Sequence, residues 1–349
     1  MTLFDLAKEL NVSISTISRA LSRPEVVAPA TRDRILTAAR RFGFQPNDVA
    51  RSLRTRETRT IGIVVPDITN WFFGLLVKVI DQVVQERGYT VVVCNADEKA
   101  ENEMRALGIL RSRKVSGIIN CPVGAPLEGW QALLASGIPL VELDRRSGLR
   151  EVDAVVLNDE AAAAVAAEHL LQLGHRRIAT IAGPQHLSNG RARLRGFKKA
   201  LQKAGCPLPP NYLTLGDFTE DSGRVEMARL LACTPPPTAV FIANSEMTGG
   251  ALATIRERQV RIPGDLSLIG FDDARWTRYL DPPLTAFAHP TEEMGRHAAE
   301  LLLSRLGGQK PSRQARLIKL DSTLIVRDST SAPQEEEVRS EKRVASRMK

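Results

Sequence analysis

Residues 11–22, NVSISTISRALS, combine four serines, a threonine and an arginine with a regular series of apolar residues. Short hydroxyl side chains let a helix approach a polyanion closely and donate hydrogen bonds to phosphates or to base edges. An arginine guanidinium can form the paired hydrogen bonds that distinguish guanine in the major groove. We therefore expect the residues that contact double-stranded DNA to include Ile14, Ser15, Thr16, Ser18 and Arg19.

A compact set of helices is predicted to position these side chains. The first helix is indicated by apolar residues that share one face, Leu3, Leu6, Ala7 and Leu10. The pattern breaks at Asn11, and Ser13 is a suitable N-cap for a second helix that ends near Leu21. The tight turn between such helices needs a positive φ, which asparagine adopts more readily than most residues. With a third helix capped by Thr31, the pattern is that of a helix-turn-helix.

Basic residues are concentrated in the same part of the chain. The 349 residues carry a net charge of +8, and residues 1–59 hold eleven Lys and Arg against six Asp and Glu. A local excess of this sign favours a nucleic-acid partner. The alternative is a solvated surface helix with Ile14 in the core, but the helices, the turn and the charge all agree with DNA binding.

A short linker helix is predicted after this head. Asn47 can cap a helix of fewer than ten residues that ends near Arg54. Such a helix is marginal alone in water, and segments of this kind often become ordered when they bind. It could therefore couple DNA occupancy to the domain that follows.

From Thr60 onward the pattern is that of an α/β protein. Short apolar runs such as TIGIVV, TVVVC and RIATIA alternate with longer amphipathic segments, which predicts βα units with parallel sheets. A weak internal similarity suggests two such halves, with a cleft at the carboxyl ends of their strands. Residues 329–349 are poor in apolar side chains and are predicted to be a disordered tail.

Several classes of protein are disfavoured by what the sequence lacks. The widely spaced Cys94, Cys121, Cys206 and Cys233 predict reduced thiols, with neither a disulfide framework nor a metal site. No signal peptide or membrane-spanning run is recognised, so we expect a cytoplasmic protein that does not contact a membrane. Nucleotide-binding and catalytic motifs are missing, so neither a cofactor nor an enzyme is predicted. The competing classes are a sugar-active α/β enzyme with a DNA-binding head and a sugar carrier outside the cytoplasm.

The order of motifs resembles the lactose/galactose-repressor family of bacterial transcription regulators. The segments LFDLAKELNVSISTISRALS, VARSLRTRETRTIGIVVPD and GFDDARWTRYLDPPLT carry this resemblance, which extends from residue 2 to about 328. It implies an all-α helix-turn-helix head followed by a periplasmic-binding-protein-like core of two doubly wound parallel-sheet subdomains. We assign residues 1–46 to the head, 47–59 to the hinge helix and linker, and 60–328 to the effector-binding and dimerisation domain. Subdomain 1 then comprises about 60–158 and 290–320, and subdomain 2 about 159–288 and 321–328.

The resemblance also implies how DNA is bound. It predicts a homodimer on a pseudo-palindromic operator, with Leu53 of each chain inserted into the minor groove at the centre and kinking the DNA. Ala50 and Arg54 of the same hinge helix are predicted to contact DNA as well. The tail lacks leucine heptads, so a dimer is preferred over a tetramer.

The effector site implied by the resemblance consists of Phe73, Asp144, Arg193, Asn244, Asp272 and His289. Carboxylates, an amide and an arginine around an apolar wall are suited to vicinal hydroxyls, so we expect a sugar or sugar derivative that releases the operator. A corepressor that promotes DNA binding is the alternative. Other interpretations remain open for single residues: Asp144 as a turn former, Arg193 as a surface charge and His289 as a satisfied core residue. Ser245 stands where the family usually has aspartate.

Overall fold

The computed structural model describes residues 3–22, 24–43, 58–124, 126–307 and 315–334. Its chain divides into two compact units, Met1–Thr58 and Arg59–Lys349. The hinge residues Ala50, Leu53 and Arg54 lie outside the described residues, so the short hinge helix stays a prediction.

The described part of the first unit is helical. It contains α1 (Leu3–Leu10), α2 (Ile14–Ser22), the 3-10 turn η1 (Pro24–Val26) and α3 (Pro29–Arg41). Its core is formed by small and branched apolar side chains from all three α-helices, namely Leu6, Ala7, Ile17, Ala20, Ile35, Ala38 and Ala39. Asn11 has a φ of 50°, as predicted for the turn between α1 and α2.

The start of α3 differs from the sequence-based expectation. Thr31 is not its cap, because the helix begins at Pro29 and the N-cap position, Ala28, makes no side-chain hydrogen bond. Proline suits the first turn of a helix because its φ is already helical and its missing N–H needs no partner there. Within α3, Arg34 Nη2 donates to the carbonyl of Leu10 at 3.0 Å. This hydrogen bond satisfies a backbone carbonyl at the C-terminus of α1.

The second unit contains two six-stranded sheets. The first has the order β11-β5-β4-β3-β1-β2, with strands β1 (Thr60–Val65), β2 (Thr90–Asn95), β3 (Gly117–Asn120), β4 (Leu140–Leu143), β5 (Asp153–Leu157) and β11 (Leu317–Leu320). The second has the order β12-β10-β9-β8-β6-β7, with strands β6 (Ile178–Ala182), β7 (Leu213–Leu215), β8 (Ala239–Ile242), β9 (Ser267–Gly270), β10 (Thr285–Ala288) and β12 (Thr323–Ile325). All neighbours are parallel except β10 and β12.

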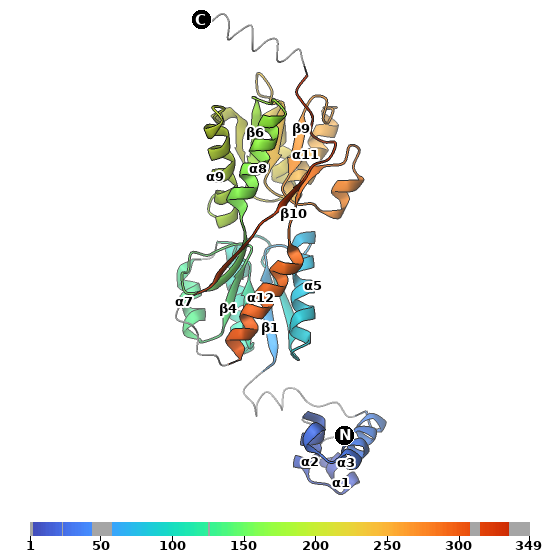
Figure 1. Ribbon diagram of the computed structural model, residues 1–349. Helices are drawn as coiled ribbons and strands as arrows, with labels where there is room; N and C mark the ends of the chain where they lie inside the picture. Colours follow the sequence, from blue (N-terminus) through green and yellow to red (C-terminus); the bar gives the residue numbers. More distant parts are fainter. Residues whose placement is uncertain (1–2, 23, 44–57, 125, 308–314, 335–349) are drawn as a thin grey trace, which may run out of the picture. The chain divides into compact units, whose positions relative to one another are not determined.

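Helices cover these sheets in two groups. The first sheet is accompanied by α5 (Trp71–Gln85), α6 (Ala100–Ser112), α7 (Leu127–Ala135) and α12 (Thr291–Leu306). The second is accompanied by α8 (Asp159–Gln172), α9 (Ser188–Lys203), α10 (Glu220–Leu231) and α11 (Ser245–Glu257), with the 3-10 turns η2 (Pro210–Tyr212) and η3 (Arg275–Tyr279). α5 packs on α12, and α8 packs on α9 (Figure 1). The predicted fold class, a helix-turn-helix head with a two-sheet α/β core, is confirmed.

The segments in which the chain crosses from one sheet to the other form hydrogen bonds with one another. One passage is at Asn158, whose side-chain amide donates to Asp321 Oδ1 at 2.8 Å. Another is at His289, whose Nδ1 lies 2.8 Å from the hydroxyl of Ser322. Hydrogen bonds therefore tie the crossing segments together, and the two halves are joined through one small region.

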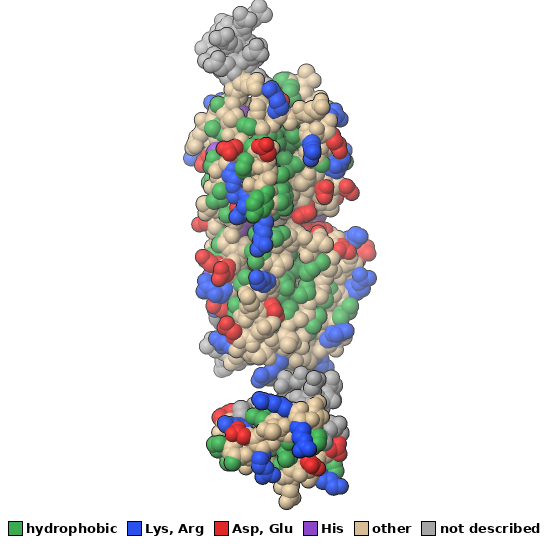
Figure 2. Space-filling model, turned by 90° about the vertical axis from the view of Figure 1, so that its right-hand side faces the viewer, with side chains coloured by type: hydrophobic (Ala, Val, Ile, Leu, Met, Phe, Trp, Pro, Cys, Tyr) green, Lys and Arg blue, Asp and Glu red, His purple; other side chains and the backbone are tan. Residues whose placement is uncertain are grey.

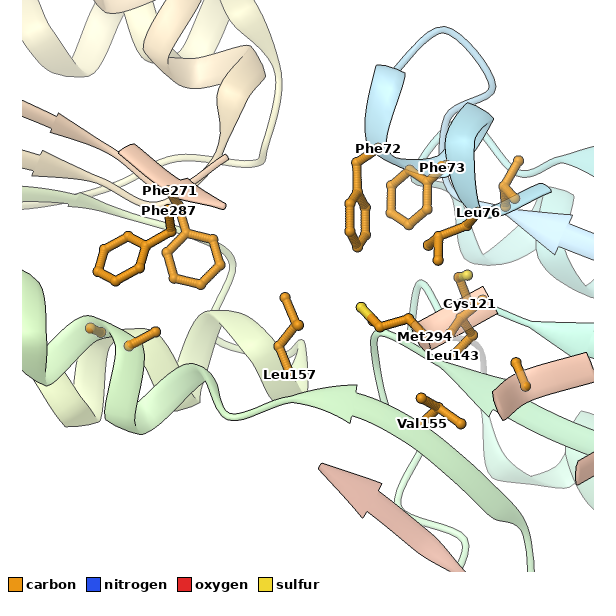
Figure 3. Close-up of a cluster of buried hydrophobic side chains, with 14 of the residues drawn as sticks. Phe72, Phe73, Leu76, Cys121, Leu143, Val155, Leu157, Phe271, Phe287 and Met294 are labelled. Atoms are coloured by element: carbon orange, nitrogen blue, oxygen red, sulfur yellow. The ribbon is translucent and has the colours of Figure 1, made fainter. Parts of the chain in front are cut away.

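Aromatic side chains fill the space next to these crossings. Phe72 and Phe73 of α5 lie edge to face with centroids 5.2 Å apart, and Phe271 and Phe287 lie 5.4 Å apart in the other half (Figure 3). The imidazole of His289 contacts both groups, at 5.7 Å from the Phe72 ring and 5.0 Å from the Phe271 ring. The core is thus continuous from one half to the other.

The predicted disordered tail begins too early. Ser329 is buried and its hydroxyl donates to the carbonyl of Leu268 at 2.7 Å. The carbonyl of Ser331 accepts from the His175 ring at 2.8 Å. The low apolar content suggested disorder, but Ser329 and Ser331 form hydrogen bonds with Leu268 and Ser267 at the start of β9. Residues 329–334 are therefore part of the fold, and residues 335–349 lie outside the described residues.

Candidate functional site

The exposed face of α2 carries the side chains that the sequence assigned to DNA. Ile17 and Ala20 are buried against α1 and α3, whereas Ser15 and Arg19 are exposed and Ile14 is 46% exposed. Thr16 and Ser18 lie partly buried at the border between the two faces. The structure therefore excludes the alternative in which Ile14 is a core residue.

Hydroxyl groups gather at the N-terminus of α2. The Ser13 hydroxyl accepts a hydrogen bond from the Thr16 N–H at 3.1 Å, as expected for an N-cap. It also lies 2.7 Å from the hydroxyls of both Ser15 and Thr16. A helix N-terminus with hydroxyl groups around it is a favourable place for a phosphate, because the helix dipole and the N–H groups both attract anions.

Replacing Arg19 by alanine is expected to relax the preference for one base pair. The exposed guanidinium at this position can form two hydrogen bonds to guanine, and their loss should cost about 1–3 kcal/mol at that base pair. Arg40→Ala removes the same charge from an exposed position in the last turn of α3. Any loss of affinity that it causes should be the same for all sequences. Competition among single-base operator variants measures the difference, and an unchanged base preference in Arg19→Ala would contradict the assignment.

A cavity of about 450 Å³ lies in the second unit between the two halves. It lies at the carboxyl ends of the parallel strands, near β1 and β6, where the strand order changes direction in each sheet. This is the usual ligand position in such sheets. Its lining includes the predicted residues Phe73, Asp144, Arg193, Asn244 and Asp272. His289 does not line it.

Asp144 follows β4 and is held in an unusual conformation. Its φ is 64°, and it is only 3% exposed to solvent. One carboxylate oxygen accepts from the Asn189 amide at 3.2 Å, while the other has no hydrogen-bond partner. Burial raises the pKa of Asp144 to about 6, although Arg145 and Arg193 oppose the shift. The aspartate therefore has an unused hydrogen-bond acceptor within the cavity wall.

Arg193 is a buried residue of α9 rather than a surface charge. Its Nε donates to Asp159 Oδ1 at 2.7 Å, and its Nη1 donates to the carbonyl of Ala243 at 2.6 Å. The guanidinium also stacks on Phe271, 3.6 Å from the ring centroid. These contacts fix the guanidinium at the cavity wall.

Gly196 allows α9 to approach α8 closely enough for this pair. A Cβ at position 196 would lie 2.0 Å from the carbonyl oxygen of Glu160 in the first turn of α8. A larger residue would push the helices apart. Arg193 lies one turn before this glycine and Asp159 one residue before Glu160, so the close approach brings the ion pair together.

Asp272 and Asn244 lie at the ends of neighbouring strands. Asp272 accepts from the Ser245 N–H at 2.6 Å and lies 2.9 Å from His289 Nε2. Burial acts to raise the pKa of Asp272, but the hydrogen bond and charge of His289 together with Arg193 hold it below the ordinary value. Asn244 caps α11 by accepting from the Met247 N–H at 3.0 Å. Asp272 is thus an ionised residue in the cavity wall.

His289 acts from behind Asp272. Its ring bridges Asp272 and Ser322 and packs between the aromatic residues of the two halves. The alternative of a satisfied core residue describes this position better than a residue that contacts the effector. His289 orients Asp272 and links it to the region where the chain crosses between the halves.

Sequence reasoning missed other cavity residues. Arg145 donates to both oxygens of Glu98 at 2.6 and 2.7 Å, and Asn189 and Glu246 also line the cavity. Glu98 follows the strand segment TVVVCN, so its place just past a strand end was a usable signal. Glu246 lies at a similar distance past β8 and directly follows Ser245, so it carried the same signal, whereas Asn189 in the first turn of α9 had no comparable mark.

The described residues give no sign of a metal centre or a membrane span. Among them no three His, Cys, Asp or Glu side chains are placed to hold a metal ion. No helix within these ranges is long and apolar enough to cross a bilayer.

Comparison with known families accounts for both units. The model described as bacterial regulatory proteins, lacI family, matches residues 2–47, and that of a periplasmic binding protein-like domain matches residues 167–330. The chain is 35% identical over 335 residues to the HTH-type transcriptional repressor CytR of Escherichia coli strain K12, covering 95% of this chain and 96% of CytR. It is 31% identical to catabolite control protein A of Priestia megaterium, covering 95% and 99%.

Solved structures agree with these relatives. The lac repressor dimer bound to operator and the anti-inducer ONPF matches with a TM-score of 0.83 and 28% identity, covering 95% of this chain and 99% of that one. The cellobiose complex of the regulator CelR matches with a TM-score of 0.72 and 32% identity, covering 94% and 99%. The chain belongs to the lacI family of bacterial regulatory proteins. It is a DNA-binding transcription regulator regulated by a small molecule, and not an enzyme.

Proposed function

We propose that this regulator is a cytoplasmic homodimeric repressor that a small polyhydroxylated effector releases from a palindromic operator. The cavity supports this most directly. It places buried carboxylates, a fixed guanidinium and the apolar face of Phe73 around a volume of about 450 Å³, and these groups together suit a sugar-sized ligand with several hydroxyls. The similar CelR structure contains cellobiose.

In this proposal the parts of the chain have separate tasks. The head, residues 1–46, reads the major groove, and the hinge segment 47–59 contacts the minor groove through Ala50, Leu53 and Arg54. Residues 60–328 bind the effector and the second protomer. Asp144, Arg193, Asn244 and Asp272 contact the effector, Phe73 packs against it, and His289 holds Asp272 in place.

Operator selection followed by gel-shift titration tests the proposal. Sites are first selected from random double-stranded DNA, and a palindrome is expected because two identical heads bind it. An effector that binds the cavity should then weaken operator binding, because it must favour the form that does not bind DNA. Log affinity should fall steeply with log salt, by about 0.9 per neutralised phosphate.

Two results of these titrations would contradict the proposal. A bound ligand that strengthens operator binding would make the protein a corepressor-dependent regulator. A ligand that binds the cavity without any effect on the operator would contradict the proposed coupling.

A further inference from the structure

The cavity carries far more negative than positive side chains. Its lining includes the seven carboxylates of Asp67, Asp97, Glu98, Asp144, Glu220, Glu246 and Asp272, but only the two guanidiniums of Arg145 and Arg193. Acidic side chains are also visible on the surface around the junction of the two halves (Figure 2). A cleft with walls of low dielectric and charges of one sign concentrates ligands of the opposite sign.

Neither arginine offsets this charge for a ligand. Arg145 is bound through two nitrogens to Glu98, and Arg193 is bound to Asp159 behind the cavity wall at 2.7 Å. Arg145 Nε also lies 3.5 Å from Asp144 Oδ2. Each guanidinium is therefore already paired with carboxylate, and the two of them are shared among seven acidic side chains of the lining. An anionic effector would have to displace one of these pairs or enter beside uncompensated carboxylates.

A buried carboxylate oxygen in the cavity wall has no hydrogen-bond partner. Asp144 is 3% exposed and lines the cavity, and its Oδ1 has no hydrogen-bond partner. Buried polar atoms are normally satisfied, and exceptions often mark ligand sites. Because an ionised carboxylate only accepts hydrogen bonds, its partner must be a donor.

Carboxylates from both halves also line the cavity together. Glu246 lies in the first turn of α11 and Glu220 begins α10 in the second half, whereas Asp67 follows β1 in the first half. Burial first, and then the charge of Asp67, raises the pKa of Glu246, and Glu220 adds to this effect. The like charges repel one another, and a cation bound between them would remove that cost.

We infer that the effector carries a cationic nitrogen, so that it is a polyhydroxylated amine such as an amino sugar rather than a neutral or anionic sugar. The ammonium group lies among Glu246, Asp67 and Glu220, and the hydroxyls contact the remaining polar wall. Phe73 and Phe218 provide apolar surface for the ring. This inference rests on the proposed function and adds the charge of the ligand.

Calorimetric titration of the full-length protein at pH 7 tests the inference with matched sugars. The panel contains glucose, galactose and mannose, the 2-amino derivative of each, and the 6-phosphate of each. At least one amino sugar is expected to bind about tenfold more tightly than its parent hexose, because a charged hydrogen bond is stronger than a neutral one. The phosphates are expected to bind more weakly than the parent hexoses.

Two variants locate the charge effect. Glu246→Gln should lower the affinity for the bound amino sugar about tenfold while leaving the parent hexose nearly unchanged. Glu101→Gln is the control, since Glu101 is exposed on α6 and does not line the cavity. Asp67→Asn, which keeps an acceptor for the Thr69 N–H at 2.8 Å, provides a second variant with the same expected result.

The inference is overturned if a neutral or phosphorylated sugar binds more tightly than its amine, or if no amino sugar of the panel binds. Operator release by a neutral sugar would refute the cationic effector and leave the proposed function standing. An amino sugar that binds as expected but does not release the operator would refute the release mode alone.

Discussion

An Asp272→Asn repressor is expected to stay on its operator at effector concentrations that release the wild type. The carboxylate is ionised, lines the cavity and is held by Ser245 N–H and His289. Loss of a charged hydrogen bond should cost roughly 2–3 kcal/mol of effector affinity, which is about a 30- to 150-fold rise in dissociation constant. Gel-shift titration with the effector measures the shift.

Asp273→Asn is the matched control for this substitution. Asp273 is the next residue, but its carboxylate binds Arg327 at 2.8 and 2.9 Å and does not line the cavity. The control should therefore respond to effector as the wild type does. Asparagine at position 272 keeps an acceptor for Ser245, so operator affinity without effector should not change. Release of the Asp272→Asn protein at the wild-type effector concentration would contradict the site assignment.

Arg193→Ala is expected to destabilise the protein as well as abolish its response to effector. The substitution leaves the carboxylate of Asp159, which is 5% exposed, without the guanidinium that lies 2.7 Å away. It also removes the donor to Ala243 and the contact with the Phe271 ring. Removing one partner of a buried ion pair costs about 3–5 kcal/mol. Urea unfolding of the effector-free protein at pH 7 measures this loss.

A double-mutant cycle separates stability from effector binding. Asp159→Ala combined with Arg193→Ala removes the stranded carboxylate, so the double variant should unfold at higher urea concentration than Arg193→Ala alone. Both variants should remain unresponsive to effector, because both lack the guanidinium at the cavity wall. Additive losses of stability in the two single variants would show that the pair is not coupled.

The stability loss should also depend on pH. Burial raises the pKa of Asp159 in the folded protein even with Arg193 beside it, and without the arginine the pKa should rise further. A carboxyl group with a raised folded pKa destabilises the fold increasingly as the pH rises above its unfolded pKa. The Arg193→Ala deficit should therefore be smaller at pH 5 than at pH 7, and a larger deficit at pH 5 would contradict this cause.

The periodicity of the sequence determined the class of the fold. Apolar residues three and four apart around Leu6 and Ile17 require helices with one buried face, and the short apolar runs from Thr60 onward require buried parallel strands. Asn11 was identifiable as the turn residue because few other side chains tolerate its φ of 50°. These features depend on nearby residues, so the sequence displays them directly.

Features that depend on distant residues were not visible in this way. The antiparallel pairing of β12 depends on the open edge of β10. The packing of residues 329–334 depends on polar groups at the start of β9. The low apolar content of that segment predicted disorder, because its hydrogen-bond partners, such as Leu268 and His175, lie far away in the chain.

Some features of the cavity could be predicted from the sequence, and others required the tertiary structure. The sequence placed Asp144, Asn244 and Asp272 at strand ends, which parallel sheets bring to one edge. Only the tertiary structure decided that Arg193 pairs with Asp159, that Arg145 is occupied by Glu98, and that His289 lies behind Asp272. Ion pairing inside a protein depends on distances between atoms far apart in the chain, because Coulomb energy and desolvation change steeply over a few ångströms. The residue types were thus set by the sequence, and the net negative character of the cleft by the fold.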